Sequence, residues 1–255
     1  MGELVADFTQ EFYRRSLAVR FTATWCGYCP TMASSIDAAI EMVPGRLIPF
    51  TLHATDSQGG LAYSGTSNFA GLYQISGYPS GRVNGYAAVK NYQVSTGKEI
   101  FAGLATEAVS SLPSKTNIGG FVSVAGGQVD AMLSVAVKEA GTYKISAFVL
   151  EDGIQYQQDG AGSDYTHNYV VRKEMTGIYG NEFSTSSANE TKEFNFSIPV
   201  PSSVINAANL HVVVYVTYAG SYTGSVSYAE YVNYGIVIDN VVDIKANDLC
   251  DFKYE

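Results

Sequence analysis

Residues 21–32, "FTATWCGYCPTM", contain two cysteines with two residues between them, directly behind a tryptophan. The overlapping stretch SLAVRFTAT, residues 16–24, alternates apolar side chains in the manner of a strand. After the motif, apolar residues recur at helical spacing, at Met32, Ile36, Ala39, Ile40 and Val43. The cysteines are therefore predicted at a junction between a strand and a helix, with Cys26 at the helix start and Cys29 one turn further in.

This position favours redox chemistry at the cysteine pair. The unpaired backbone N–H groups and the dipole at a helix N-terminus stabilise a thiolate, which is the nucleophile of disulfide exchange. Pro30 fits the first helical turn, because the N–H that proline lacks would have no partner there. We therefore predict one reversible disulfide between Cys26 and Cys29, with the cysteines themselves as the redox group and no separate cofactor.

Two other kinds of site use the same cysteine spacing. A structural zinc site usually needs four ligands, but the chain has only one further cysteine, Cys250, and three scattered histidines, His53, His167 and His211. The expectation is therefore that no metal is bound. A purely structural disulfide would close so short a loop that it gains little chain entropy. Both alternatives stay open at this point, although the redox interpretation is preferred.

Composition limits the classes of partner. The 255 residues are 46% hydrophobic and 15% charged, which is enough apolar content for a sizeable core. The net charge of −9 leaves no basic patch for nucleic acid or for an anionic membrane surface. No apolar run approaches the roughly 20 residues of a membrane span. Residues 1–12 show no signal peptide, which fits a cytosolic protein or an exported protein without its export signal.

The first half of the chain resembles the thioredoxin fold. The predicted helix is followed by a strand at residues 46–54, a short helix at 67–75, a strand after Tyr78-Pro79 and a helix at 103–112. With Trp25-Cys26-Gly27-Tyr28-Cys29 ahead of Tyr78-Pro79, this order is similar to that family over residues 1–112. The resemblance implies that the bond before Pro79 is cis and that Pro79 flanks the dithiol. It also implies that Trp25 packs beside the site and that Tyr78-Pro79 shapes a groove for client chains.

Two details distinguish the motif from cytosolic thioredoxin. The family carries a buried acidic residue six positions before the first cysteine, where this chain has Arg20. The proton relay attributed to that acid is therefore in doubt, and we expect Arg20 to point to solvent rather than to lower the pKa of the cysteine. The Gly27-Tyr28 pair between the cysteines is more similar to that of periplasmic disulfide isomerases.

From about residue 117 the pattern changes to strands. Runs rich in Val, Tyr and Ile alternate with Gly-rich turns, without helical spacing. This predicts an antiparallel β-sandwich of immunoglobulin-like type, joined to the first half through residues 112–119. The expected organisation is an α/β thioredoxin-like domain at residues 1–114 and an all-β domain at 115–255. Residues 149–180 are expected to form a long loop, with His167 bonded locally.

The two halves together resemble a more specific family, the lipoproteins related to outer membrane protein twenty-eight of Bacteroides-type bacteria. The resemblance lies in the CxxC domain and in a later pattern LEDG…Q…HN…VR…G, here Leu150, Glu151, Asp152, Gly153, Gln157 or Gln158, His167, Asn168, Arg172 and Gly177. It implies a processed protein in the periplasm, or at the outer membrane or surface of a Gram-negative cell, held by a lipid anchor. The lipobox cysteine of such precursors is absent from this sequence, as in a chain whose leader has been removed.

The function predicted from the sequence is thiol–disulfide exchange with client or donor proteins. The predicted site consists of Cys26, Cys29, Trp25, Tyr78 and Pro79. We expect a monomer, and we expect Cys250 to be a small buried residue rather than a free reactive thiol or an intermolecular partner. The competing interpretation is a cell-surface binding or adhesion lipoprotein, in which the tyrosine-rich second half binds a partner or glycan and the CxxC is structural or vestigial.

Overall fold

The computed structural model describes residues 4–85, 87–89, 92–220, 229–231 and 235–255. In the first half, strands and helices alternate as predicted, although the last helix begins at Val94 rather than near residue 103, and a short strand, β4, is added. The elements are β1 (Ser16–Thr22), α1 (Cys29–Met42), β2 (Leu47–His53), α2 (Thr66–Leu72), β3 (Ser80–Val83), β4 (Ala87–Val89) and α3 (Val94–Ser111).

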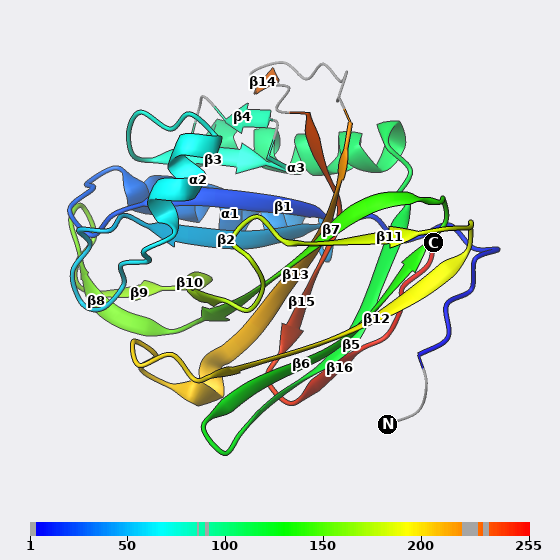
Figure 1. The fold of residues 1–255 in the computed structure, drawn as a ribbon. Coiled ribbons are helices and arrows are strands. Elements are labelled where there is room, and N and C mark those ends of the chain that lie inside the picture. Colours follow the sequence, from blue (N-terminus) through cyan, green and yellow to red (C-terminus); the bar gives the residue numbers. More distant parts are fainter. Residues whose placement is uncertain (1–3, 86, 90–91, 221–228, 232–234) are drawn as a thin grey trace.

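The second half consists almost entirely of strands, so the whole fold is rich in β structure and has few helices (Figure 1). One of the Val-, Tyr- and Ile-rich runs predicted as strands, residues 229–239, is divided between β14 and β15, and its residues 232–234 lie outside the described residues. The elements are β5 (Thr116–Ala125), β6 (Gln128–Val137), β7 (Gly141–Glu151), β8 (Ile154–Gln158), β9 (Gly162–His167), β10 (Val170–Glu174), β11 (Asn181–Thr185), β12 (Glu190–Pro199), the 3₁₀ turn η1 (Ala207–Asn209), β13 (Leu210–Ala219), β14 (Ala229–Tyr231), β15 (Ile236–Lys245) and β16 (Asp248–Cys250).

The prediction of a long loop at residues 149–180 is wrong, because this segment contains three strands. β8 and β9 pair as an antiparallel hairpin, closed by a turn in which the Ala161 N–H donates to the Gln158 carbonyl at 3.0 Å. Gly160 and Gly162 supply the positive φ angles of this turn, which a glycine adopts without strain. His167 does bond locally, with its Nε2 3.3 Å from the Tyr156 carbonyl oxygen. The glycines that indicate a loop in the sequence therefore form a tight hairpin turn.

One mixed sheet runs through both halves of the chain (Figure 1). Its main path has the strand order β14-β4-β3-β1-β2-β10-β7-β13-β15, with β11 also paired to β7. β1 pairs in parallel with β2 and antiparallel with β3. The sheet passes from the first half to the second at β2 and β10, where Thr51 is paired with Val170. The Thr51 N–H also donates to the Tyr169 carbonyl at 2.9 Å, so backbone hydrogen bonding connects the two halves at this point.

Helices cover both faces of the first part of this sheet. α1 and α3 pack on one face, in a cluster that includes Met32, Ile36 and Phe101, whereas α2 packs on the other face through Phe69. β1 is therefore buried on both sides along its whole length. For this reason the prediction that Arg20 points to solvent is wrong. Arg20 is buried and donates to the Thr51 hydroxyl at 3.2 Å from Nη2.

Two layers of strands enclose the core of the second half. The four-stranded sheet β12-β6-β5-β16 packs against β7, β13 and β15, and the cluster between them is built mainly from Val, Ile, Leu and Ala side chains. A second cluster is shared with the first half, where the Phe148 ring lies 5.1 Å from Phe50 and 5.8 Å from Phe69. The apolar cores of the two halves are thus continuous across the sheet.

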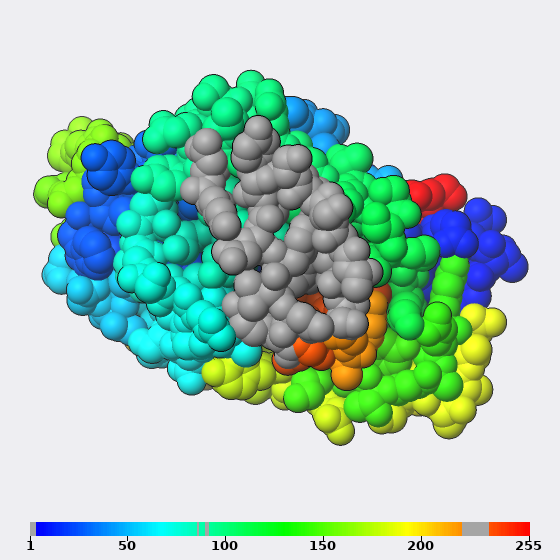
Figure 2. Space-filling model, turned by 90° about the horizontal axis from the view of Figure 1, so that it is seen from above, coloured from blue at the N-terminus to red at the C-terminus, as the bar shows by residue number. Residues whose placement is uncertain are grey.

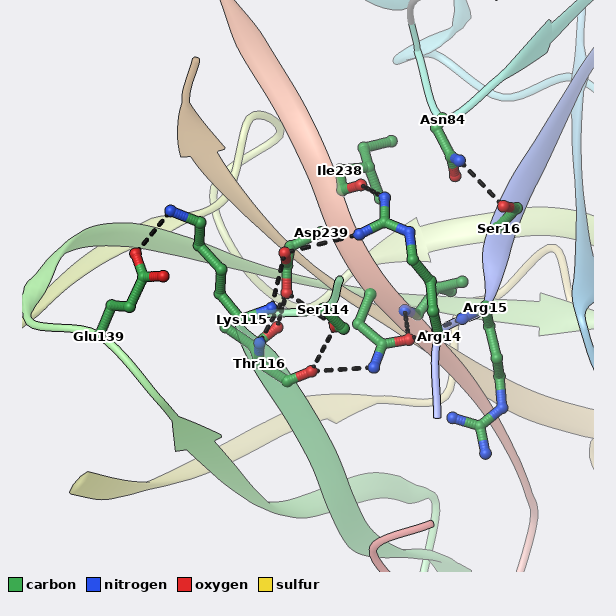
Figure 3. A network of polar contacts seen from close by, with 12 residues as sticks. Arg14, Arg15, Ser16, Asn84, Ser114, Lys115, Thr116, Glu139, Ile238 and Asp239 are labelled. Atoms are coloured by element: carbon green, nitrogen blue, oxygen red, sulfur yellow. Dashed lines mark hydrogen bonds and ion pairs between the residues drawn. The ribbon is translucent and has the colours of Figure 1, made fainter. Parts of the chain in front are cut away.

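A buried polar network lies where the predicted domain boundary falls (Figure 3). The Asp239 carboxylate on β15 accepts hydrogen bonds from Ser114 Oγ at 3.0 Å, from the Lys115 N–H at 3.1 Å and from the Thr116 N–H at 2.7 Å. It also forms an ion pair with Arg14, at 3.6 Å, and both side chains are buried. The network ties β15 to the segment before β1 and to the connection between α3 and β5.

The boundary predicted between residues 114 and 115 lies in this connection. Independent folding of the two parts stays a prediction, and separate expression of residues 1–114 tests it. An unfolded fragment beside a stable whole chain would show that the shared aromatic cluster makes one folding unit of both.

Among the described residues, no helix has the length and apolar character that a membrane span requires.

Candidate functional site

The predicted disulfide between Cys26 and Cys29 is present, and Cys250 is a free thiol. Cys29 is the first residue of α1, so the prediction that Cys26 starts this helix is wrong. Two successive turns precede the helix, because the Cys26 N–H donates to the Ala23 carbonyl at 3.1 Å and the Cys29 N–H donates to the Cys26 carbonyl at 3.1 Å. Pro30 lies in the first helical turn, as predicted.

The two cysteines differ in their access to solvent. Cys29 is fully buried, whereas Cys26 keeps 5% of its surface exposed. Both pack in a small cluster with Ala23, Ala54 and the partly buried Tyr78. Of the two cysteines, only Cys26 therefore has any solvent-exposed surface.

Two aromatic side chains, Trp25 and Tyr78, lie beside the disulfide. Trp25 is 49% exposed, and its ring meets Tyr78 edge-on with the centroids 5.7 Å apart. The Trp25 Nε1–H donates to Asp56 Oδ1 at 3.0 Å, which fixes the orientation of the indole. The Tyr78–Pro79 bond is cis, as the resemblance to thioredoxins implied. The structure thus places Trp25 and Tyr78 beside the disulfide, with Pro79 next to Tyr78 in the chain.

The tip of the β8–β9 hairpin also contacts the CxxC loop, which the sequence analysis did not predict. Gln158 Nε2 donates to the carbonyl oxygens of Ala23 at 3.1 Å and Cys26 at 2.9 Å. The neighbouring Asp159 N–H donates to the Thr24 carbonyl at 2.9 Å. Figure 2 shows this hairpin, in light green, at one end of the molecule beside blue residues of the segment between β1 and α1. The only sequence signal was the Gln in the LEDG…Q…HN pattern, which does not reveal what that side chain contacts.

A buried ion pair supports the base of this hairpin. Glu151, at the end of β7, lies 3.2 Å from Arg172 on β10, and both side chains are almost completely buried. Arg172 also donates to the Gly60 carbonyl at 2.9 Å. The Glu151 carboxylate accepts the backbone N–H groups of Ile205 at 2.9 Å and Asn206 at 2.6 Å. Two residues of the LEDG…VR pattern therefore hold the strands on either side of the hairpin.

A second group of contacts near the base of this hairpin consists of a histidine between two carboxylates. The buried His211 contacts Asp243 through Nδ1 and lies 3.4 Å from Asp152 through Nε2. Asp152 in turn accepts the N–H of Tyr169, the residue directly before β10, at 2.7 Å. Burial alone would lower the pKa of His211, but the hydrogen bonds and charges of Asp152 and Asp243 outweigh it and raise that pKa. The two carboxylates therefore favour the imidazolium form of His211.

This arrangement predicts a pH-dependent contribution to stability. A pKa that is raised in the folded state means that the stabilisation by His211 is complete below the unfolded value of about 6.5 and is lost as the pH rises through the folded value. We expect the free energy of unfolding of the wild type to exceed that of a His211→Asn variant by more at pH 6 than at pH 9. Urea unfolding at both pH values measures this difference. An equal difference at both pH values would contradict a raised pKa for His211 in the folded protein.

Two further histidines and Arg20 lie between the sheet and the hairpin. His53, at the end of β2, is fully buried, and its ring centroid is 5.2 Å from that of His167 on β9. Burial, followed by the positive charge of Arg20, lowers the pKa of His53 well below its usual value. Burial likewise lowers the pKa of His167, to about 4. Both imidazoles are neutral at pH 7, and in the described part of the chain no three His, Cys, Asp or Glu side chains gather as a metal ion would require.

A pocket lined largely by aromatic side chains lies elsewhere in the described part of the chain. It has a volume of about 400 Å³ and lies between α2 and the ends of β7, β13 and β15. None of the predicted site residues lines it. Six aromatic residues contribute to its wall, namely Phe69, Tyr73, Tyr143, Tyr179, Tyr215 and Tyr218.

Comparison with known proteins identifies the family. The family model of outer membrane protein Omp28 matches residues 66–230. The chain belongs to the Omp28 family. The match includes Tyr78, Pro79 and the hairpin but begins after the two CxxC cysteines. Membership in the Omp28 family indicates an envelope or outer-membrane location, while the chemistry has to be argued from the site.

Solved structures share the fold of this Omp28-family chain. HBP35 of Porphyromonas gingivalis is similar with a TM-score of 0.73 and 16% identity, over 96% of this chain and 79% of that one. A protein of Agrobacterium tumefaciens is similar with a TM-score of 0.54 and 13% identity, over 94% of this chain and 97% of that one. No curated protein matches. The shared β-rich fold and the Cys26–Cys29 disulfide are compatible with thiol–disulfide chemistry.

Proposed function

We propose that this Omp28-family protein catalyses thiol–disulfide exchange in the bacterial envelope through Cys26 and Cys29. The observation that carries the proposal is a disulfide at the N-terminus of α1 in which Cys26 keeps 5% of its surface exposed and Cys29 is fully buried. This asymmetry suits one cysteine that meets the client and a second that acts only within the protein. The N–H groups at the start of α1 favour the thiolate form of cysteines beside them.

Each exchange moves two electrons. In the reducing direction, the Cys26 thiolate attacks one sulfur of a client disulfide, forms a mixed disulfide and releases one client thiolate. The Cys29 thiol then loses its proton and attacks the Cys26 sulfur, which releases the second client thiolate and restores the Cys26–Cys29 disulfide. The oxidising direction is the reverse. Trp25 and the cis Tyr78–Pro79 segment form the surface that the client chain contacts.

The domain assignment that goes with this function is a thioredoxin-like unit at residues 1–114 and an immunoglobulin-like sandwich at 115–255. The parallel β1–β2 pair, the antiparallel β3 and the helices on both faces support the first part. The two packed antiparallel layers support the second. In this arrangement the sandwich contributes the hairpin that contacts the CxxC loop.

The proposed setting is an exported, lipid-anchored monomer that works on client or donor proteins in the periplasm or at the cell surface. Family membership supports the envelope location. The envelope is an oxidising compartment, where disulfides form and persist and where a dithiol needs a partner to keep it reduced. Clients with accessible disulfides or thiols are therefore the expected partners.

The direct test measures turnover with defined clients. With dithiothreitol as electron donor, we expect the whole chain to accelerate the reduction of insulin disulfides, and in a glutathione buffer to reactivate scrambled ribonuclease. A Cys26→Ser/Cys29→Ser double variant serves as the matched control. Rates equal to those of the double variant in both assays would exclude the proposed function.

A second candidate function is supported by the aromatic pocket between α2 and β13. Its volume of about 400 Å³ lies within the usual range of small-molecule sites. In that case the protein would be a surface binding protein, and the CxxC would be structural or vestigial. Reduced thiols that titrate near the unperturbed value of about 8.5, together with no exchange activity, would favour this alternative.

A further inference from the structure

We propose that Gln158, contributed by the β8–β9 hairpin, is a positioning residue that controls the reactivity of Cys26. The inference rests on the proposed exchange function and adds a second part of the chain to its site. Residues 26 and 158 are far apart in the sequence, and their contact places the CxxC under the influence of the second half.

The contact is buried and specific. Gln158 keeps only 2% of its surface exposed, and its Nε2 is directed at the carbonyl oxygens of Ala23 and Cys26. The same nitrogen lies 3.3 Å from the Asp159 carbonyl oxygen. The Ala23 and Cys26 carbonyls also accept the two turn hydrogen bonds that lead into α1. Gln158 therefore holds both turns of the CxxC loop through one amide group.

The hairpin tip fits closely against this loop. A side chain added at Gly160 would collide with the Gly27 carbonyl oxygen, so the backbones meet with no room for a Cβ atom. Asp159 adds a backbone hydrogen bond to Thr24, and the Thr24 hydroxyl accepts the Gln58 N–H at 3.0 Å. The loop that carries Cys26 is thus enclosed by the hairpin on one side and by the segment after β2 on the other.

The chemical effect follows from the charge of these groups. Carbonyl oxygens carry partial negative charge, which disfavours a thiolate nearby, and a donor that engages them offsets part of that charge. Replacement of Gln158 by Glu keeps the side-chain shape, removes the donor and adds a negative charge close to Cys26. The Cys26 thiolate should then be less stable. Replacement by Met removes the hydrogen bonds without adding charge.

The test uses the reduced whole chain and measures the pH dependence of Cys26 alkylation by iodoacetamide in a Cys29→Ser/Cys250→Ser background. We expect Gln158→Glu to slow alkylation at pH 7 about tenfold, and Gln158→Met to slow it by a smaller factor. Gln157→Glu is the matched control, because it makes the same charge change at an exposed neighbouring residue and should stay within about twofold of the parent.

Two outcomes decide the inference. An alkylation profile that stays unchanged in both Gln158 variants, with a native circular dichroism spectrum, would overturn it. If the Glu variant does not fold, Gln158→Met and Gly160→Ala give the same test, because each disturbs the contact without burying a charge. Alkylation needs no client, so this test is independent of disulfide-exchange activity. A protein without exchange activity whose Cys26 alkylation slows as predicted would refute the proposed function and still support the role of Gln158.

Discussion

Replacement of Cys26 by Ser is expected to reduce disulfide exchange with a fluorescent disulfide peptide to the uncatalysed background. The loss should be on the order of a thousandfold or more, as removal of a catalytic nucleophile usually gives. The physical reason is that Cys29 is fully buried, so no client sulfur can reach it in the folded protein. Stopped-flow fluorescence with the reduced whole chain measures the rate.

The Cys29→Ser variant should behave differently. Its Cys26 can still attack the peptide once, but no second thiol is present to release the mixed disulfide. We expect a single rapid burst and a stable adduct that mass spectrometry assigns to Cys26. Cys250→Ser is the control and should leave the rate unchanged, because Cys250 takes no part in the disulfide. Undiminished exchange by the Cys26→Ser variant, or an adduct at Cys250, would contradict these roles.

Replacement of Asp239 by Asn is expected to reduce the free energy of unfolding by about 3–5 kcal/mol. The substitution keeps the shape but removes the charge that compensates the buried Arg14. It also turns an NH₂ group toward donors such as the Thr116 N–H, which then lacks an acceptor. Urea unfolding monitored by circular dichroism gives the value, and the midpoint should fall without a large change in slope.

The matched control for this prediction lies in the same network. Glu139 forms an ion pair with Lys115, but the Glu139 side chain is 60% exposed. Glu139→Gln should therefore cost only about 0–1 kcal/mol, as surface ion pairs usually do. If Asp239→Asn lowered the free energy of unfolding no more than Glu139→Gln does, the buried network at the connection between α3 and β5 would contribute little to stability.

Local signals in the sequence predicted the parts of the site that lie close to the cysteines. Apolar spacing after the motif placed α1, and the resemblance to thioredoxins supplied the cis bond at Tyr78–Pro79, which the structure confirms. The helix was predicted to start at Cys26, but it starts about one turn later, at Cys29. The backbone hydrogen bonds that form the turns before Cys29 leave no trace in residue spacing.

The features that the sequence did not predict depend on contacts between distant segments. Arg20 is a charged residue in a strand whose neighbours alternate, so solvent exposure was the natural expectation, but helices cover one face of β1 and the shared aromatic cluster covers the other. The glycines near residue 160 were interpreted as a loop. They form the turn that brings Gln158 to Cys26, and no local pattern predicts the partner of that side chain.

Whether the Cys26–Cys29 disulfide is redox-active can be decided from its reduction potential. The measurement equilibrates the whole chain in glutathione buffers of known ratio and determines the fraction of reduced cysteine pairs by alkylation and mass spectrometry. We expect a potential between that of thioredoxin, about −270 mV, and that of the strongest periplasmic oxidant, about −120 mV. A potential below about −300 mV, typical of structural disulfides, would contradict it.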